Sequence, residues 1–221
     1  MKVIEQSVEL MGDIDGEEIL WKIEAAARNC YKSEGRNEER SVEKRNALIR
    51  HAVQRGHTSV LEHGVLSFRV ICDRGVSHEW VRHRIGWSYS QESTRYCNYG
   101  HAEGITVIWP THKLGPYVRD FTSEGYPDRC IWMDAMRSME KYYLQLLELG
   151  WKPEDARDPL GIALKTEIVC TANIVALRHF FKMRCAPGAH PKIRSLAGEL
   201  LYKASGKIPI VFDDLREKFI G

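Results

Sequence analysis

The 221-residue sequence contains no apolar run that approaches the roughly 20 residues needed to span a bilayer. It also lacks internal repeats, low-complexity segments and linkers, which excludes a disordered protein and a repeat protein. Residues 1–18 carry charges at short intervals and include no apolar core of a signal peptide. We therefore expect a cytoplasmic globular protein that does not bind membranes.

No two of the six cysteines stand at the C-x-x-C spacing, and the closest pair, Cys170 and Cys185, is 15 residues apart. This excludes zinc ribbons and redox dithiols. In a cytoplasmic chain we expect free, mostly buried thiols and no disulfides. Cys185 alone has a setting that favours a thiolate, because it follows Arg184 in a basic segment.

Several common catalytic motifs are also absent. The sequence has no G-x-G-x-x-G and no G-x-S-x-G, and the nearest approach to a P-loop, residues 161–166, lacks the second glycine. His78-Glu79 begins like a zinc-protease motif, but Arg82 stands where the second histidine belongs, and His83 falls on another helix face. We therefore expect no metal site, no hydrolase and no standard nucleotide-binding fold.

The chain is otherwise ordinary in composition, with 43% apolar and 28% charged residues and a net charge of +2. Its arginines are not evenly spread. Residues 178–194 contain five basic and no acidic residues, Arg157 stands alone, and Arg82, Arg84 and Arg95 alternate with tryptophans and tyrosines. Guanidinium groups beside aromatic rings suit a ligand in which a phosphate is attached to a flat ring.

Hydrophobic periodicity predicts strands over residues 2–10, 64–75, 105–109 and 167–171. It predicts helices over residues 15–32, 37–56, 76–84, 127–150, 173–184 and 189–205, and the polar residues 85–99 are expected to form a loop. We expect one α+β domain over residues 1–221, with a mixed or antiparallel central sheet packed with helices.

The predicted helix 173–184 carries four residues on one stripe: Asn173, Leu177, Phe180 and Arg184. A stripe that contains leucine and phenylalanine faces inward. Asn173 and Arg184, at its two ends, are therefore expected to line a cleft.

The segment RHRIGWSYSQESTRY, residues 82–96, resembles the signature of the flavin-dependent thymidylate synthases, in which R-H-R is followed by S-x-R-Y. Residues 26–31, 56–63, 156–173 and 179–194 resemble further segments of that family in the same order. The chain departs from the pattern in three ways. Eight residues instead of the usual seven separate R-H-R from Ser93, Gly161 stands where the family commonly has proline, and Val175 stands where it commonly has arginine.

This resemblance implies reductive methylation of deoxyuridine monophosphate (dUMP) to dTMP. The carbon donor would be 5,10-methylenetetrahydrofolate, which leaves as tetrahydrofolate, and the hydride would come from FAD that NADPH has reduced. The family is homotetrameric with active sites shared between subunits. Phosphate, pyrophosphate and the glutamate tail of the folate are all anionic, in agreement with the arginine-rich segments.

The resemblance also implies roles for individual residues. Arg184 would be the catalytic residue that stabilises negative charge developing on the uracil ring. FAD would be held by Ser59, Glu62, Arg82, His83, Arg84, Gln91, Asn173 and His179. The substrates would be bound by His57, Glu79, Arg82, Gln91, Glu92, Ser93, Thr94, Arg95, Arg157 and Arg184. Ser93 is expected to be a phosphate or sugar ligand, because its neighbours offer no general base for a nucleophile.

Three other functions are compatible with these residues. The same chemistry could act on another pyrimidine nucleotide, as the longer signature loop and Val175 suggest. A single-stranded nucleic-acid binder could use the arginines and aromatic rings as a stacking groove, without a flavin. A catalytically silent nucleotide sensor is the third. The resemblance favours the enzyme, with no nucleic-acid partner.

Overall fold

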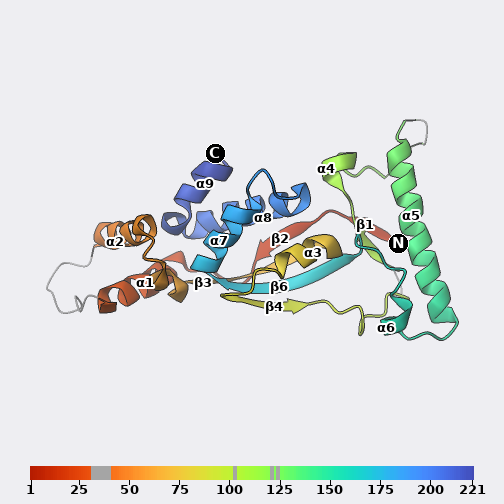
Figure 1. The fold of residues 1–221 in the computed structure, drawn as a ribbon, viewed down its shortest axis with the longest axis horizontal. Helices are drawn as coiled ribbons and strands as arrows, with labels where there is room; N and C mark the ends of the chain where they lie inside the picture. Colours follow the sequence, from red (N-terminus) through yellow and green to blue (C-terminus); the bar gives the residue numbers. More distant parts are fainter. Residues whose placement is uncertain (31–40, 102–103, 120–121, 123–124) are drawn as a thin grey trace. The chain divides into compact units, whose positions relative to one another are not determined.

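The computed structural model describes residues 1–30, 41–101, 104–119, 122 and 125–221 (Figure 1). The chain forms two compact units, each assembled from segments distant in sequence. Unit 1 consists of Met1–Ser7, Val70–Val81 and Ser90–Ile168. Unit 2 consists of Val8–Arg69, Arg82–Tyr89 and Val169–Gly221. Four of the boundaries between the units fall within strands: β2 (Ser7–Leu10), β3 (Val65–Asp73), β4 (Trp87–Gln91) and β6 (Lys165–Asn173). The fifth follows Val81.

The strands form a four-stranded sheet with the order β2-β3-β6-β4, in which β2 is Ser7–Leu10, and a separate two-stranded sheet. In the latter, β1 (Lys2–Ile4) runs parallel to β5 (Thr106–Ile108), with Lys2 opposite Thr106. Burial alternates residue by residue along β6, as the two-residue period of a strand requires. The structure combines an antiparallel four-stranded sheet with helices packed on it, which confirms the expected α+β class.

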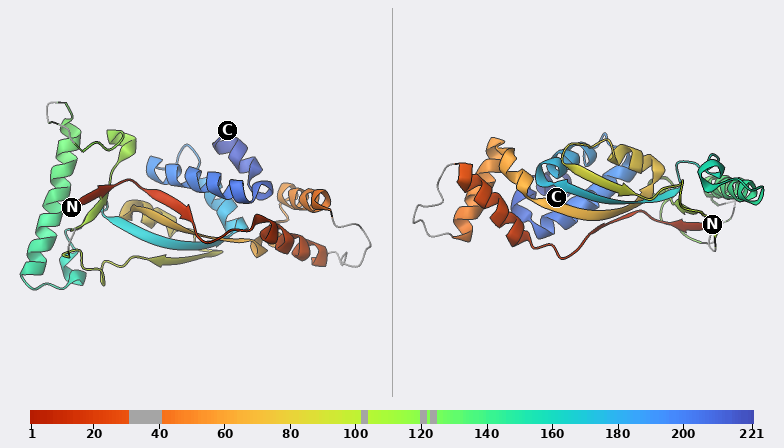
Figure 2. Two further views of the ribbon diagram at one scale, coloured as in Figure 1. Left: turned by 180° about the vertical axis from the view of Figure 1, so that it is seen from behind. Right: turned by 90° about the horizontal axis from the view of Figure 1, so that it is seen from below.

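The helices of unit 2 pack mainly against one another. They are α1 (Gly16–Cys30), α2 (Val42–Arg55), α7 (Ile174–Arg184), α8 (Pro191–Lys207) and α9 (Asp213–Phe219), with 3-10 turns η1 (Thr58–His63) and η2 (Pro209–Val211). The Asp15 carboxylate accepts the backbone N–H groups of Glu17 and Glu18 at 2.9 and 3.1 Å and so caps α1. Helix α7 lies beside α8 (Figure 2) and also packs on η1.

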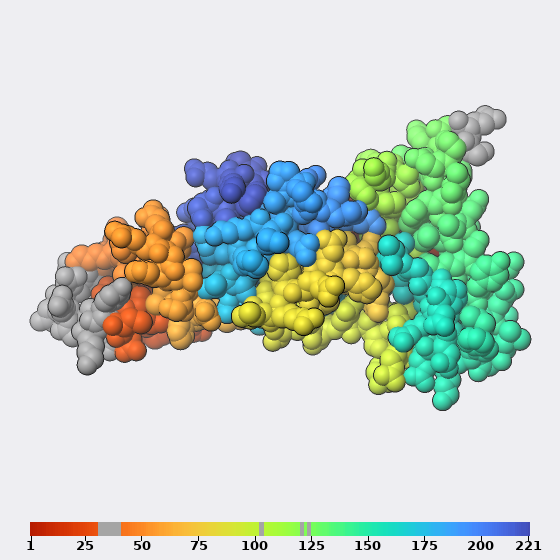
Figure 3. Space-filling view, viewed as in Figure 1, coloured from red at the N-terminus to blue at the C-terminus, as the bar shows by residue number. Residues whose placement is uncertain are grey.

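Unit 1 contains α3 (Arg74–Trp80), α4 (Thr111–Leu114), α5 (Pro127–Glu148) and α6 (Pro153–Ala156). Its core joins Met139 and Tyr143 of α5 to Val107 of β5 and to Leu164. Other residues of α5, which is drawn in green in Figure 3, lie at the surface: Ile131 and Tyr142 are 71% and 55% exposed.

Three predicted elements differ from the structure. The strand expected over residues 2–10 is two strands, because the chain leaves the extended pairing at Glu5 and Gln6. The helix expected over residues 76–84 starts at Arg74, where the Asp73 carboxylate caps Val76 N–H at 2.7 Å, and ends at Trp80. The expected loop 85–99 contains β4, whose alternation of aromatic and serine residues is a strand signal. The expected ends 31–32 and 37–40 of the first two helices lie outside the described residues.

Arg178, which the sequence placed in an anion-binding segment, instead joins α7 to α9. Its two terminal nitrogens donate to the carboxylate oxygens of Asp214 at 2.7 and 2.6 Å, and one of them also donates to the carbonyl of Val211. The Arg178 side chain is only 8% exposed. Its charge is therefore neutralised within the fold, and the expectation that it contributes to an anion site is wrong.

Candidate functional site

Arg82 and Arg84 lie in a turn, residues 82–86, that is held against the start of α7. Gly86 has φ +74°, and a Cβ atom there would lie 2.7 Å from the side-chain nitrogen of Asn173. The Gly86 carbonyl accepts the Asn173 N–H at 3.0 Å. Asn173 in turn caps α7, because its side-chain oxygen accepts the N–H of Ala176 at 2.8 Å. Glycine is thus required for the turn to approach the helix so closely.

This turn, η1 and α7 enclose a cavity of about 720 Å³ in unit 2. Its predicted members are Glu62, Arg82, His83, Arg84, Asn173, His179 and Arg184. The rest of the lining is largely apolar: Ile85, Trp87, Val175, Ala176 and Met183. Asn173 and Arg184 both line the cavity, as their spacing predicted, while Leu177 and Phe180 between them are fully buried.

Arg184 is oriented by His83. The Arg184 Nε–H donates to His83 Nε2 at 3.0 Å. A guanidinium has donors only, so His83 Nε2 carries no proton and the neutral ring holds its proton on Nδ1. Burial, the charge of Arg184 and His179 lower the pKa of His83 to about 4. His83 is therefore a neutral hydrogen-bond acceptor at physiological pH.

This environment makes the stability of the protein depend on pH. The pKa of His83 is about 4 in the folded protein and 6.5 ordinarily, so the unfolded chain binds more protons between these values. The stabilisation from neutral His83 is complete above about pH 6.5 and falls as the pH drops towards 4. In an NMR titration, we expect the His83 ring signals to move with a midpoint near pH 4. A midpoint near 6.5 would show that the ring is not held in this environment.

An aromatic cluster supports the turn from the side of β4. Trp87 stacks on Tyr89 with ring centres 5.6 Å apart and contacts Phe180 at 5.4 Å. The Tyr89 hydroxyl donates to the His83 carbonyl at 2.6 Å, and burial together with Cys170 raises the pKa of Tyr89 well above its usual range. Tyr89 thus stays protonated and fixes the backbone at His83.

His57 and Ser59 do not line the same cavity as Arg82 and Arg84. They line a second cavity of unit 2, about 600 Å³ in volume, together with Ala27, Cys30, Leu48, His51, Ala52 and Val60. The short turn η1 carries both Ser59 and Glu62, and it directs them to different cavities. Ser59 and Glu62, both predicted to bind FAD, therefore lie on the same short element but line different cavities.

The remaining predicted residues lie in unit 1. A cavity of about 290 Å³ is lined by Arg157 and Thr94 and by two cationic or ionisable residues that were not predicted, Arg74 and His78. The Arg157 Nη1 donates to the Thr94 hydroxyl at 2.9 Å. The lining does not include five further predicted residues: Glu79, Gln91, Glu92, Ser93 and Arg95. Arg74 and His78 are four residues apart on α3, so their side chains lie on the same face of that helix. This spacing is the sequence signal that could have identified both as candidate site residues.

Arg95 and Gln91, two of these five residues, contact other side chains of unit 1. Arg95 lies 3.3 Å from a carboxylate oxygen of Glu154 in an exposed ion pair. The side-chain nitrogen of Gln91 donates to the hydroxyls of Ser77 and Thr166, which are fully buried. Surface ion pairs of the Arg95 kind contribute little to stability, so Arg95 can exchange partners at low cost.

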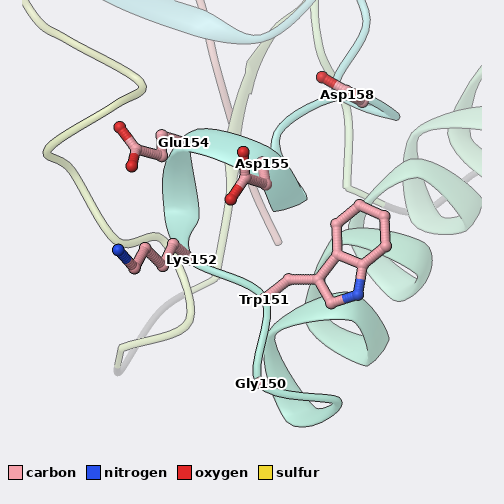
Figure 4. Close-up of a pocket in the computed structure, with 6 residues that line it drawn as sticks. All are labelled: Gly150, Trp151, Lys152, Glu154, Asp155 and Asp158. Atoms are coloured by element: carbon pink, nitrogen blue, oxygen red, sulfur yellow. The ribbon is translucent and has the colours of Figure 1, made fainter.

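A further cavity in unit 1, about 640 Å³ in volume, lies where the chain passes from α5 to α6 (Figure 4). It is lined by Gly150, Trp151, Lys152, Glu154, Asp155 and Asp158. The lining includes three carboxylates and only one ammonium group, so the cavity disfavours a phosphate. It is larger than the Arg157 cavity, but its chemistry does not suit the expected ligands.

The cysteines carry no sign of nucleophilic chemistry. All six are free thiols, and Cys72, Cys170 and Cys185 are buried, whereas Cys30 is exposed. Burial raises the pKa of Cys185 to about 12. The thiolate suggested by its neighbour Arg184 is therefore wrong, because desolvation outweighs the nearby charge.

Within the described ranges, no helix is long and apolar enough to cross a membrane. In the same part of the chain, no group of three or more histidine, cysteine, aspartate or glutamate side chains is arranged to hold a metal ion.

Comparisons with known proteins agree on one family. Residues 16–210 match the family described as "Thymidylate synthase complementing protein". The flavin-dependent thymidylate synthase of Geobacter sulfurreducens is 36% identical over 193 residues, which are 86% of this chain and 78% of that protein. The enzyme of the same name from Mycolicibacterium gilvum is 34% identical over 223 residues, covering 94% and 83% of the two chains.

A solved structure has the same fold. The UMP/dUMP methylase PolB from Streptomyces cacaoi, determined with 5-Br dUMP, superposes with a TM-score of 0.75 at 23% identity and covers 99% of this chain and 98% of that one. The extent of the family match and the identity to its relatives are decisive. The chain belongs to the flavin-dependent thymidylate synthase family. It is accordingly a flavin-dependent enzyme.

Proposed function

We propose that this enzyme methylates dUMP at C5 to give dTMP. The proposal takes 5,10-methylenetetrahydrofolate as the carbon donor and FAD, reduced by NADPH, as the source of the hydride. Membership of the family supports the reaction. The structural observation that carries the proposal is the gathering of Arg82, Arg84 and Arg184 in one cavity of unit 2.

The residues of this cavity fit a flavin nucleotide. Its volume of about 720 Å³ is within the range of cofactor sites. Arg82 and Arg84 are exposed at its edge and suit a pyrophosphate, while Trp87, Val175 and Met183 offer an apolar surface to a ring system. A reduced flavin bound here would supply the hydride that completes the methyl group. His179 and Asn173 would contribute polar contacts.

We assign the charge-stabilising role to Arg184. Its Nε is bonded to neutral His83, so the plane of the guanidinium is set before a substrate arrives. A preoriented cation stabilises negative charge developing on the uracil ring without reorganisation during the reaction. In unit 1, Arg157 with Thr94 provides a cationic site suited to the nucleotide.

The proposal includes a homotetramer with active sites shared between subunits. The family resemblance supports it, and the distribution of the predicted site residues over two units and three cavities is compatible with sites completed by other subunits. Sedimentation velocity measures the mass, and a value near the 25.5 kDa of one chain would contradict this part of the proposal.

A second acceptor is supported by one observation. The solved structure with the same fold is that of a UMP/dUMP methylase. UMP is therefore the ribonucleotide to compare with dUMP. In this proposal, the residues around Arg157 and Thr94 decide which of the two sugars is bound.

The test is an anaerobic incubation of the protein with FAD, NADPH, methylenetetrahydrofolate and either dUMP or UMP. Mass spectrometry of the nucleotides identifies the product. We expect conversion of dUMP to dTMP, dependent on every component. Methylation of UMP alone would establish the second acceptor, and no methylation of either nucleotide would refute the proposal.

A further inference from the structure

Glu92, one of the predicted nucleotide ligands, turns its carboxylate towards other side chains of unit 1. Its Oε2 accepts from the Lys165 ammonium at 2.7 Å, and its Oε1 accepts from the Tyr99 hydroxyl at 2.8 Å. The side chains of Glu92 and Lys165 are only 17% and 20% exposed. Both carboxylate oxygens are therefore engaged within the protein.

The backbone of Glu92 is held as firmly as its side chain. Its N–H donates to the Glu167 carbonyl at 2.8 Å. Its carbonyl accepts from Arg74 Nη1 at 3.2 Å, and the same nitrogen donates to the fully buried Thr166 hydroxyl at 3.0 Å. Glu92 is thus fixed at four atoms, immediately before the segment Ser93–Arg95.

The surroundings of Lys165 and Tyr99 keep both side chains protonated over a wide pH range. The Lys165 ammonium also lies 3.4 Å from a carboxylate oxygen of Glu167. Burial lowers the pKa of Lys165, but the hydrogen bonds and charges of Glu92 and Glu167 outweigh it and raise that pKa. Burial and the bond to Glu92 raise the pKa of Tyr99 far above its ordinary value of 10. Lys165 therefore stays charged, and Tyr99 stays a donor.

We infer that Lys165 and Tyr99 are positioning residues, which hold Glu92 so that Ser93, Thr94 and Arg95 present their polar groups to the nucleotide. Glu92 itself then makes no phosphate contact, in keeping with the repulsion between a carboxylate and a phosphate dianion. This role takes the place of the direct contact suggested by the sequence. This inference rests on the proposed function, because it describes how the segment Ser93–Arg95 is held in place to bind dUMP.

A change in the position of Glu92 acts directly on the predicted nucleotide-binding residues beside it. Ser93 and Thr94 follow Glu92 directly, so a displacement of Glu92 moves them. Thr94 is buried and accepts from Arg157 at 2.9 Å, and the Arg95 N–H donates to the Ser93 hydroxyl at 3.2 Å. The loss of the anchor at Glu92 therefore changes the positions of the two residues that follow it.

The experiment measures dUMP binding and turnover in variants of the anchor. Lys165→Met leaves Glu92 and Glu167 without their shared cation, and we expect the Kd for dUMP to rise about tenfold with kcat changed less than about threefold. Lys165→Arg is expected to restore most of the affinity. Tyr99→Phe removes one hydrogen bond and should raise the Kd about threefold. The matched control, Lys22→Met, removes an exposed ion pair with Glu18 and should leave both values unchanged.

Two further measurements distinguish a positioning role from a general loss of stability. They are the coupling between Lys165 and Glu92 in dUMP binding and the affinity for FAD. Because Lys165 acts through Glu92, the double variant Glu92→Gln/Lys165→Met should weaken dUMP binding no more than Lys165→Met alone. FAD affinity, followed by flavin fluorescence, should be unchanged in all variants. A wild-type Kd for dUMP in Lys165→Met and Tyr99→Phe overturns the inference, as does an equal loss of FAD and dUMP affinity. A wild-type enzyme that neither binds nor converts dUMP refutes the proposed function, and the inference falls with it.

Discussion

Replacing Arg184 by methionine is expected to lower kcat by about 10³-fold, the effect of removing one preorganised charge-stabilising donor from an active site. The long apolar side chain fills the same part of the cavity but provides no positive charge. Arg184→Lys should recover only part of the activity, because an ammonium lacks the planar Nε–H that bonds to His83 at 3.0 Å. The measurement is single-turnover oxidation of the reduced flavin with dUMP and the folate present.

A matched substitution shows whether the loss is specific. Arg137 on α5 is 65% exposed and pairs only weakly with Asp134, so Arg137→Met should retain the wild-type rate. The assignment of Arg184 would be contradicted if Arg184→Met kept its kcat and lost only FAD affinity, since the residue would then be a ligand of the cofactor alone.

Replacing Arg178 by methionine is expected to destabilise the protein by about 3 kcal/mol, at the lower end of the range for a broken buried ion pair. The lower end applies because Asp214 is 52% exposed and can regain water. The substitution also removes a donor from the Val211 carbonyl. Urea unfolding measures the difference, with Arg137→Met as the control that should change the free energy of unfolding by less than about 0.5 kcal/mol.

The partner residue gives this prediction a pH signature. Burial raises the pKa of Asp214, but its bonds to Arg178 outweigh burial and lower it below the ordinary 3.8. The stabilisation from the pair is therefore complete above the pKa of the unfolded chain and is lost as the pH falls through the lower folded value. The free energy of unfolding of Arg178→Met should therefore lack this loss at acid pH. Equal stability of wild type and variant at neutral pH would show that the pair does not anchor α9.

Local periodicity predicted most of the long elements. Helices α1, α5, α7 and α8 and strands β3 and β6 follow apolar spacings that leave little choice of structure. The gathering of Asn173 and Arg184 in one cavity also followed from helical spacing alone. The predicted end of α3 is too late because Val81 continues the apolar pattern, although the helix ends at Trp80.

Long-range partners could not be predicted. Arg178 and Asp214 are 36 residues apart, and Glu92 and Lys165 are 73 apart, so their sequence neighbourhoods show the charges but not the pairings. The sequence therefore did not show that Arg178 is neutralised within the fold or that Glu92 is held by Lys165. The sequence around Cys185 likewise did not show that its thiol is buried.

The central claim, that the cavity of Arg82, Arg84 and Arg184 receives a flavin for reaction with dUMP, is tested most directly by visible absorption. The purified protein is supplied with FAD, freed of excess, and mixed anaerobically with NADPH in the presence or absence of dUMP. We predict a flavin band that NADPH bleaches, and that bleaches faster when dUMP is bound. A protein that remains colourless after FAD is supplied would contradict the account.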